Sequence, residues 1–374
     1  MKKQFKKKIY FGIVSLLFLS GCGKADNTKD ITTDINYSQS APGFFTETES
    51  GYYFSSGDYF YYSDKDNIKF VKLCNKPDCL HSSSDCNAFN HGGKCDTHFY
   101  AGRLVFPYYE IGENGNNVII ASKDVDGTAE KNEKVIELPV GLYSGKMHRD
   151  YFVYNVVEME ENSTKQHSYL YLQKLDNLKE DPQVIYDYVE REETKNAEIV
   201  VNAMVNNYIY FYTEGTLYRY DIESGKFVQV EGYEAGRRGE YYTEDRIYQI
   251  DMDNNFFYRE VESGKCVSLK SEKNENICGP FFSDGERIYR INQSYGDTIV
   301  SEENNGIYIY DMEGNYIDFI KYRMKENSGI YFVIADDKVF VFDTPDYQTV
   351  TSGSYFEKSK IGKEELSWKD IIVE

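Results

Sequence analysis

The chain has 374 residues and a formal charge of −20 at neutral pH, with 62 acidic side chains against 42 basic ones. So acidic a surface disfavours nucleic acid, and it disfavours direct adhesion to anionic lipid headgroups. The length exceeds that of an average single domain, so a single domain of this size requires a repetitive architecture.

The first residues have the pattern of a secretory leader. Residues 2–8 carry five lysines and no acid, and an apolar run follows from Ile9 to Leu19. That run is too short to span a bilayer as a helix, and a basic stretch before a short apolar stretch is typical of a signal peptide. Leu19-Ser20-Gly21-Cys22 is similar to the bacterial lipobox. Residues 1–21 are therefore predicted to be a lipoprotein signal peptide, with Cys22 acylated by palmitate-type chains that hold the protein to the membrane.

A polar segment follows the predicted lipidation site. Residues 22–43 are nearly free of aromatic side chains and end in Pro42-Gly43. Such a segment cannot bury enough apolar surface to become ordered. It is predicted to be a flexible tether between the lipid and a folded domain.

Short alternating runs of Tyr, Ile, Val and Phe, separated by polar turns, recur along the rest of the chain. In the clearest copy, residues 208–230, Ile209 and Phe211 share one face, and Tyr210 and Tyr212 share the other. Alternation with period two between glycine-containing turns predicts antiparallel hairpins. The 36 Tyr and 23 Phe of the chain suit such strands because aromatic rings pack well on a pleated surface.

This plan begins again at seven places. Their mean separation is about 45 residues, the length of one four-stranded propeller blade. Residues 44–374 are therefore predicted to form an all-β propeller of about seven blades. Six or eight blades are alternatives, and a β-sandwich array or β-solenoid is the competing fold. The seven starts are Tyr59, Arg103, Tyr151, Tyr208, Arg246, Arg287 and Ile330.

The two ends of the predicted propeller carry further expectations. A propeller must close its ring, because an open edge strand invites aggregation. Residues 44–54 are expected to supply an outer strand to the last blade. Residues 363–372 are the segment whose pattern suggests a helix.

Cysteines and histidines interrupt the repeat between residues 73 and 100. Pro77-Asp78 and the glycines after His91 indicate a compact loop, inserted after the first two strands. A short polar loop has little apolar surface, so it needs a covalent or metal staple to stay ordered. The cysteines of the loop are Cys74, Cys79, Cys86 and Cys95, and its histidines are His81, His91 and His98.

Disulfide bonds are the first chemistry that can hold the loop. Outside the cytoplasm the four loop cysteines can oxidise to two disulfides. The other pair is Cys266 and Cys278, so an even six cysteines remain once Cys22 is acylated. The sequence favours this interpretation, in which His81 is not a ligand, and leaves free or redox-active thiols as another option.

Metal binding is the alternative. Cys74, Cys79, His81 and Cys86 can bind one structural Zn²⁺ as three thiolates and an imidazole. Their spacing, C-x₄-C-x-H-x₄-C, differs from that of the usual zinc fingers, and Cys95 is left over. No other cofactor is predicted.

The same segment carries a resemblance to a known family. Leu73 to His81, LCNKPDCLH, followed by Asp85-Cys86-Asn87-Ala88, resembles a signature of uncharacterised propeller-like lipoproteins of Firmicutes, particularly clostridial relatives. The lipobox and the repeated Ile-Tyr-x-Tyr strands are similar to that group as well. The resemblance implies a lipid-anchored propeller and implies no activity.

The sequence offers no recognised catalytic motif. It lacks a nucleophile elbow, a P-loop, a dinucleotide fingerprint and the zinc-protease helix motif. His148 and His167 are expected to be surface or turn residues, and a single tryptophan, Trp368, argues against a sialidase-type propeller. The acidic stretches 124–127 and 251–253 lack complete calcium-loop patterns and are predicted to be hairpin turns.

Two classes of function remain. The first, which the sequence favours, is a non-catalytic binding module. It would be lipid-anchored at the outer face of the cytoplasmic membrane and would present its propeller to an extracellular protein, peptide or glycan. The second is an extracytoplasmic hydrolase or lyase with its site in the central channel. No catalytic residue is identified for it.

Overall fold

The computed structural model describes residues 43–374 apart from 93–95, 113–114, 139–142, 160–165, 190–198, 235–238, 252–254, 270–279, 294–299, 323–328, 347–348 and 364. The predicted leader, Cys22 and tether lie outside the described residues, as do Cys95 and Cys278. Within the described part of the chain, no helix is long and apolar enough to cross a membrane.

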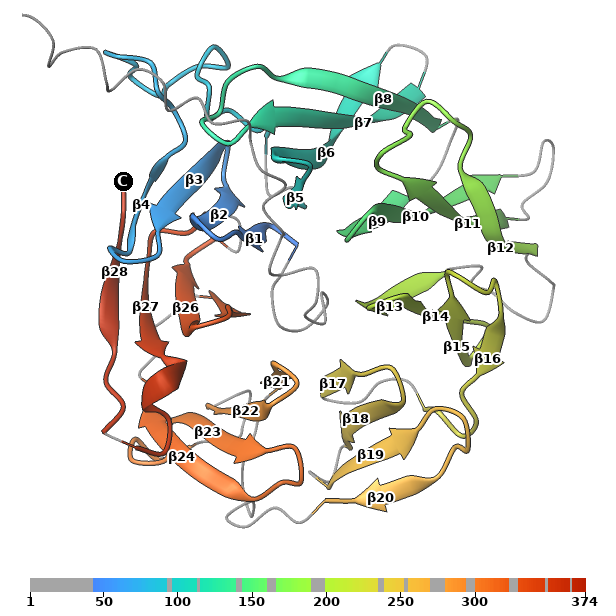
Figure 1. Ribbon diagram of the computed structural model, residues 1–374, viewed down its shortest axis with the longest axis vertical. Coiled ribbons are helices and arrows are strands. Elements are labelled where there is room, and N and C mark those ends of the chain that lie inside the picture. The colour runs from blue at the N-terminus through green and yellow to red at the C-terminus, as the bar shows by residue number, and fades with distance from the viewer. Residues whose placement is uncertain are drawn as a thin grey trace, which may run out of the picture.

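Seven blades of four antiparallel strands surround a common axis (Figure 1), so the predicted seven-bladed propeller is confirmed. Each blade is built from four consecutive strands. Blade 1 contains β1 (Phe45–Glu47), β2 (Gly51–Ser56), β3 (Tyr59–Asp64) and β4 (Lys69–Lys72). Blade 2 contains β5 (His98–Tyr100), β6 (Arg103–Gly112), β7 (Gly115–Asp124) and β8 (Lys131–Leu138). Blade 3 contains β9 (Tyr143–His148), β10 (Tyr151–Met159), β11 (Gln166–Lys174) and β12 (Gln183–Val189).

The remaining four blades follow the same plan. Blade 4 contains β13 (Val200–Val205), β14 (Tyr208–Thr213), β15 (Thr216–Asp221) and β16 (Phe227–Gln229). Blade 5 contains β17 (Gly239–Tyr242), β18 (Arg246–Ile250), β19 (Phe256–Glu260) and β20 (Cys266–Ser268). Blade 6 contains β21 (Phe281–Ser283), β22 (Arg287–Asn292), β23 (Gly306–Asp311) and β24 (Tyr316–Lys321). Blade 7 contains β25 (Gly329–Ile334), β26 (Lys338–Thr344), β27 (Ser352–Glu357) and β28 (Lys369–Val373), with the short 3₁₀ helix η2 (Lys358–Lys360) before β28.

The seven starts read from the sequence fall one in each blade, but not on equivalent strands. Those at Arg103, Tyr151, Tyr208, Arg246 and Arg287 begin the second strand of blades 2 to 6. Tyr59 begins the third strand of blade 1, and Ile330 lies in the first strand of blade 7. The blade count was right because each blade repeats one strong alternating run, whichever strand carries it.

Packing between neighbouring blades makes the core. In β14, Ile209 and Phe211 pack toward blade 3, whereas Tyr210 packs toward blade 5. Both faces of a strand are therefore buried, which explains why aromatic and branched side chains occupy both alternating sets. Seven apolar clusters fill the seven seams between adjacent blades, the seam between blades 7 and 1 included.

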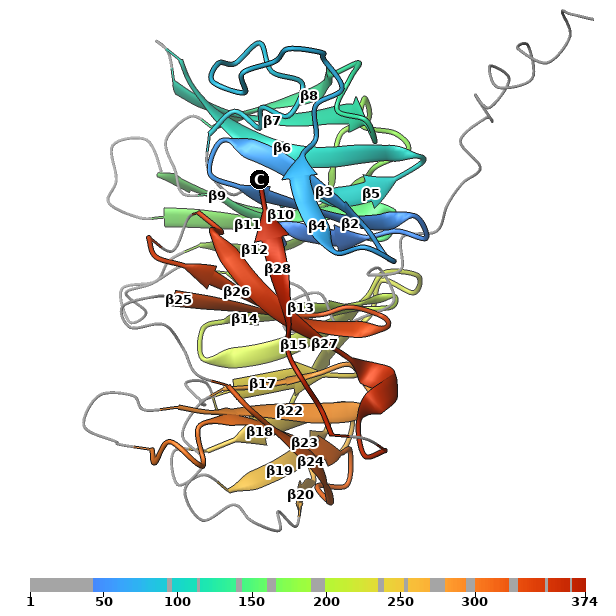
Figure 2. The ribbon, with the colours of Figure 1, turned by 90° about the vertical axis from the view of Figure 1, so that its left-hand side faces the viewer.

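The ring closes through its outermost strands. Ile372 and Val373 of β28 pair in parallel with Lys69 and Phe70 of β4, so blades 1 and 7 form one continuous sheet. The expectation that residues 44–54 supply an outer strand to the last blade is wrong, because β1 and β2 are the inner strands of blade 1. The expected helix at 363–372 is also wrong, since the chain there ends in β28. Seen from the side of the ring, blades 1 and 7 lie next to each other (Figure 2).

Polar contacts also join the blades. In five blades, the turn between the first and second strands is held by a side chain from a neighbouring blade. Two of these side chains are buried histidines, so the expectation of a surface or turn position for His148 is wrong. The five contacts are Tyr52 Oη to Asp337 (2.5 Å), His98 Nε2 to the Arg149 carbonyl (2.8 Å), His148 Nε2 to the Asn206 carbonyl (3.1 Å), Tyr210 Oη to the Thr243 carbonyl (2.8 Å) and Lys358 Nζ to Asp284 (2.6 Å).

Candidate metal centre

The cysteine- and histidine-containing segment connects blade 1 to blade 2. It begins directly after β4 and leads to β5, so its predicted position after the first two strands is wrong. Between residues 73 and 92 it forms no regular strand or helix, apart from one isolated bridge between Phe89 and Tyr59. A described stretch of this length without secondary structure of its own is uncommon in a compact domain, so the question is what holds it.

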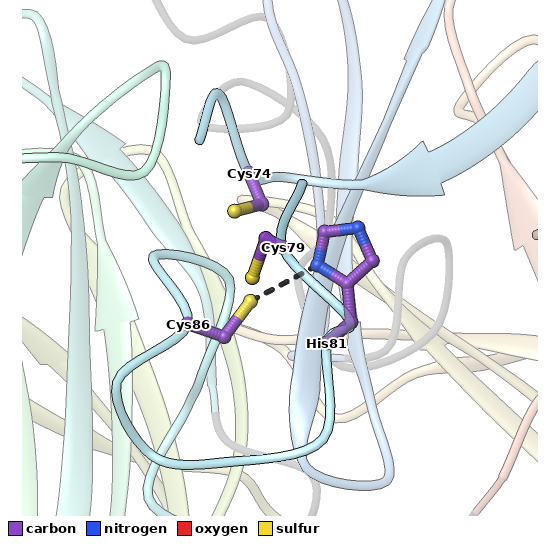
Figure 3. A group of neighbouring side chains, drawn as sticks. All are labelled: Cys74, Cys79, His81 and Cys86. Carbon is purple, nitrogen blue, oxygen red and sulfur yellow. Dashed lines mark hydrogen bonds between the residues drawn. The ribbon is translucent and has the colours of Figure 1, made fainter. Parts of the chain in front are cut away.

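Four side chains of this segment point toward one another (Figure 3). One ligand atom from each of Cys74, Cys79, His81 and Cys86 lies within 4.8 Å of the others. Cys86 is buried and the other three are partly buried. His81 Nδ1 lies 3.2 Å from Cys86 Sγ, at hydrogen-bonding distance. The sequence therefore named the four members of this cluster correctly as a possible metal-binding set.

The backbone around the cluster presents N–H groups to the sulfur atoms. Burial acts to raise the pKa of the Cys74 thiol, but hydrogen bonds from the backbone of Lys76 and Asn87 and from the neighbouring thiols hold that pKa below its usual value. Burial raises the pKa of Cys86 to about 11, although the backbone of Ala88 donates to it. Backbone N–H groups directed at sulfur stabilise thiolates, the form in which cysteine binds metals.

The ends of the segment are anchored to blade 2. Buried Lys123 of β7 donates to the carbonyls of Asn87 (3.1 Å) and Phe89 (2.7 Å), and its Nζ lies 3.0 Å from Glu130. The ring of His91 stacks on Tyr108 with centroids 4.0 Å apart, and His91 Nε2 bonds Glu130 (2.5 Å). These contacts fix residues 87–91, which directly follow Cys86, the last residue of the cluster.

The turn between β7 and β8 holds the other end. Asn75 donates to Asp126 (2.9 Å) and accepts from Asn87 (2.8 Å). Gly127 has φ +84°, and a Cβ there would lie 2.3 Å from the Leu73 carbonyl oxygen, so only glycine allows this approach. The hairpin turn predicted for 124–127 is confirmed, and it docks the segment against blade 2.

The disulfide bonds expected from the sequence remain a prediction. Cys74, Cys79 and Cys86 are free thiols in the structure, and so is exposed Cys266. Cys95 and Cys278, the other two cysteines of the predicted disulfides, lie outside the described residues. Lys123 is the residue of this region that sequence reasoning missed, because nothing in an alternating strand pattern distinguishes a buried lysine from an exposed one.

Comparison with known proteins identifies the fold of the chain. No protein-family model matches the sequence, and no curated protein matches it. Among solved structures, Hsv2 of Kluyveromyces lactis is similar, with a TM-score of 0.52 at 10% identity over 87% of this chain and 96% of that one. The β-propeller domain of the Trilobed protease from Pyrococcus furiosus gives a TM-score of 0.44 at 16% identity over 73% and 81%. The fold and the cluster together define a seven-bladed β-propeller with a Cys/His-bearing connection between its first two blades.

Proposed function

We propose that this protein is a lipid-anchored binding module of the bacterial cell surface, which presents its propeller to a protein, peptide or glycan. The propeller supports an interaction or scaffold module in general. The lipobox supports the anchor, and the polar segment 22–43 supports a tether that holds the propeller away from the bilayer.

The unequal length of the central hairpins carries the binding proposal. The second and third strands of blade 2 have 10 residues each, and those of blade 3 have 9 each. The corresponding strands of the other blades have 5 to 7 residues. At about 3.3 Å per residue, the surplus makes these two hairpins roughly 10 Å longer than those of the other blades.

The end of β6, in the long hairpin of blade 2, exposes apolar side chains. On β6, Val105 is buried in the seam with blade 3, whereas Tyr109 is 53% exposed and Ile111, nearer the end of the strand, is 88% exposed. All three lie on the same face of the strand. A strand that continues past the core with its apolar face in solvent is unfavourable unless a partner covers it.

Four ionisable groups on the innermost strands have structural roles, which supports binding over catalysis. Glu47 of β1 is fully buried, forms an ion pair with Lys65 (2.7 Å) and accepts from the Asp336 backbone. His98 and His148 hold the turns of neighbouring blades. Glu240 of β17 accepts from the hydroxyl of Tyr233 (2.9 Å). These described groups maintain the ring, which leaves them poorly suited to act on a substrate.

The binding proposal is tested with a ligand screen followed by substitutions in β6. The full chain is applied to glycans, peptidoglycan fragments and peptides, and the best ligand is titrated. We expect the double variant Tyr109→Ser with Ile111→Ser to weaken binding at least about tenfold, because exposed aromatic and aliphatic anchors carry most interface energy. Phe227→Ser, at an exposed position on blade 4, is the matched control and should bind normally. Equal affinity for the double variant and wild type, or turnover of the ligand, contradicts the proposal.

Anchoring has its own test at Cys22. We expect Cys22→Ser to abolish incorporation of a clickable fatty acid and to release the protein from the membrane fraction, because the sulfur of Cys22 carries the lipid. Cys266→Ser, which removes an exposed thiol far along the chain, is the control and should label like wild type. Undiminished label on the Cys22 variant would show that the lipobox interpretation is wrong.

A further inference from the structure

The interior of the connecting segment consists of its ligand-bearing side chains. From residue 75 to residue 85 every described side chain is exposed except Cys79 and His81, which are partly buried. Leu80, the aliphatic residue between them, is 88% exposed. The segment therefore turns its polar ligand atoms inward and its apolar residue outward, the reverse of folding around an apolar core.

We propose that Cys74, Cys79, His81 and Cys86 bind one Zn²⁺ ion as a structural Cys₃His site. Three sulfurs and one imidazole nitrogen form the soft donor set that zinc prefers. Tetrahedral zinc with 2.3 Å bonds to sulfur requires ligand atoms roughly 3.8 Å apart. The four atoms already lie within 4.8 Å of one another, so small side-chain movements bring them to that geometry.

The surroundings of the cluster suit a zinc–thiolate centre. Zinc with three thiolates carries a net negative charge, and backbone N–H groups of Lys76 and Asn87 at Cys74, and of Ala88 at Cys86, offset that charge. Such outer hydrogen bonds orient and stabilise the ligands of a metal. On binding, the three thiol protons pass to solvent, and bonds from Cys86 Sγ and His81 Nδ1 to the Zn²⁺ ion replace the contact between these two atoms.

Four protein ligands leave no open position for a substrate, which makes the site structural. Cys86 and Ala88 pack with Leu73 and Phe60 in the apolar cluster between blades 1 and 2, and Cys74 and Cys79 lie against it. The metal would thus fasten residues 74–86 onto the outer end of this seam. Its binding free energy would contribute to the order of the connection.

Disulfide bonding accounts less well for the same arrangement. The predicted disulfide pairing of Cys74, Cys79, Cys86 and Cys95 would use the three sulfurs of the cluster but would not involve His81. It would also give no reason for the imidazole to point at Cys86, as it does in Figure 3. A four-ligand metal site uses every inward-facing atom.

Metal and thiol analysis of the full chain decides between the two chemistries. The protein is purified anaerobically in mild detergent, without chelator or added reductant. We expect about one zinc per chain by mass spectrometry, and thiols at Cys74, Cys79 and Cys86 that react only after the metal is chelated in denaturant. Replacing zinc with Co²⁺ should give intense visible absorption and a thiolate-to-metal charge-transfer band, because the site is tetrahedral and sulfur-rich. This spectrum needs no variant, so it does not depend on how substitutions fold.

Two variants assign the site to these residues. Cys79→Ser and His81→Ala should each lower bound zinc at least fivefold, whereas the matched controls Cys266→Ser and His167→Ala should retain it. Zinc that persists in both cluster variants would place the metal elsewhere and overturn the proposal. Oxidised cluster cysteines without metal in the anaerobic preparation would also overturn it and establish the disulfide prediction instead.

Discussion

Replacing Lys123 with methionine is expected to lower the free energy of unfolding by about 3 kcal/mol at neutral pH. The Lys123 side chain is 1% exposed, and its ammonium group bonds two backbone carbonyls of the connecting segment and Glu130. It also lies 5.0 Å from the ring centre of Phe60 and 5.4 Å from that of Phe106. Methionine fills a similar volume but leaves the two buried carbonyls without their donor, which is costly, while Glu130 keeps His91 as a partner. Urea unfolding followed by intrinsic fluorescence measures the change.

Two further variants separate the charge from the packing. Lys131→Met, at the exposed start of β8, should change stability by less than about 0.5 kcal/mol. Adding Glu130→Gln to Lys123→Met should restore only part of the loss, because it removes a carboxylate that has lost its lysine partner and leaves the two carbonyls unsatisfied. If Lys123→Met unfolds with wild-type stability, the ammonium group does not anchor the segment.

The blade count was predictable because a propeller repeats one local pattern. In β14 and β15, alternation and the turn at Glu214-Gly215 specify a hairpin without reference to the rest of the chain. Ring closure was not predictable in the same way. It depends on a parallel pair between residues about 300 positions apart, Ile372 and Lys69, and nothing in either short strand names its partner.

The candidate metal site was only partly predictable. Cys and His are rare enough here that Cys74, Cys79, His81 and Cys86 stood out by type and proximity alone. Choosing between disulfide and metal required knowing which way His81 points, which depends on the folded segment. The buried roles of His148 and Lys123 escaped prediction because burial of a polar side chain is set by the neighbouring blade and not by its own strand.

Deleting β28 by ending the chain after Trp368 is expected to lower the melting temperature by roughly 10 °C, since a domain of this size loses about 2 °C or more per kcal/mol. β28 joins the two ends of the ring: it pairs with β27 in blade 7 and, in parallel, with β4 in blade 1. Ile371 is 5% exposed and belongs to the apolar cluster of this seam. The Glu374 backbone N–H also donates to the Phe70 carbonyl (2.9 Å). Without β28, the edges of β27 and β4 are open to other chains, so size-exclusion chromatography should also show soluble aggregates.

Adjacent residues of β28 provide the control, because successive side chains of a strand face opposite sides of the sheet. Ile371→Ser should cost about 2–4 kcal/mol, since it removes a buried aliphatic side chain and places a hydroxyl in an apolar seam. Ile372→Ser, at a position that is 54% exposed, keeps the backbone pairing with Lys69 and should change stability by less than about 1 kcal/mol. Equal effects of the two substitutions would mean that β28 contributes only its backbone hydrogen bonds. A truncated chain that melts like wild type and stays monomeric would mean that the apolar seam between blades 7 and 1 holds the ring closed without the parallel strand pair.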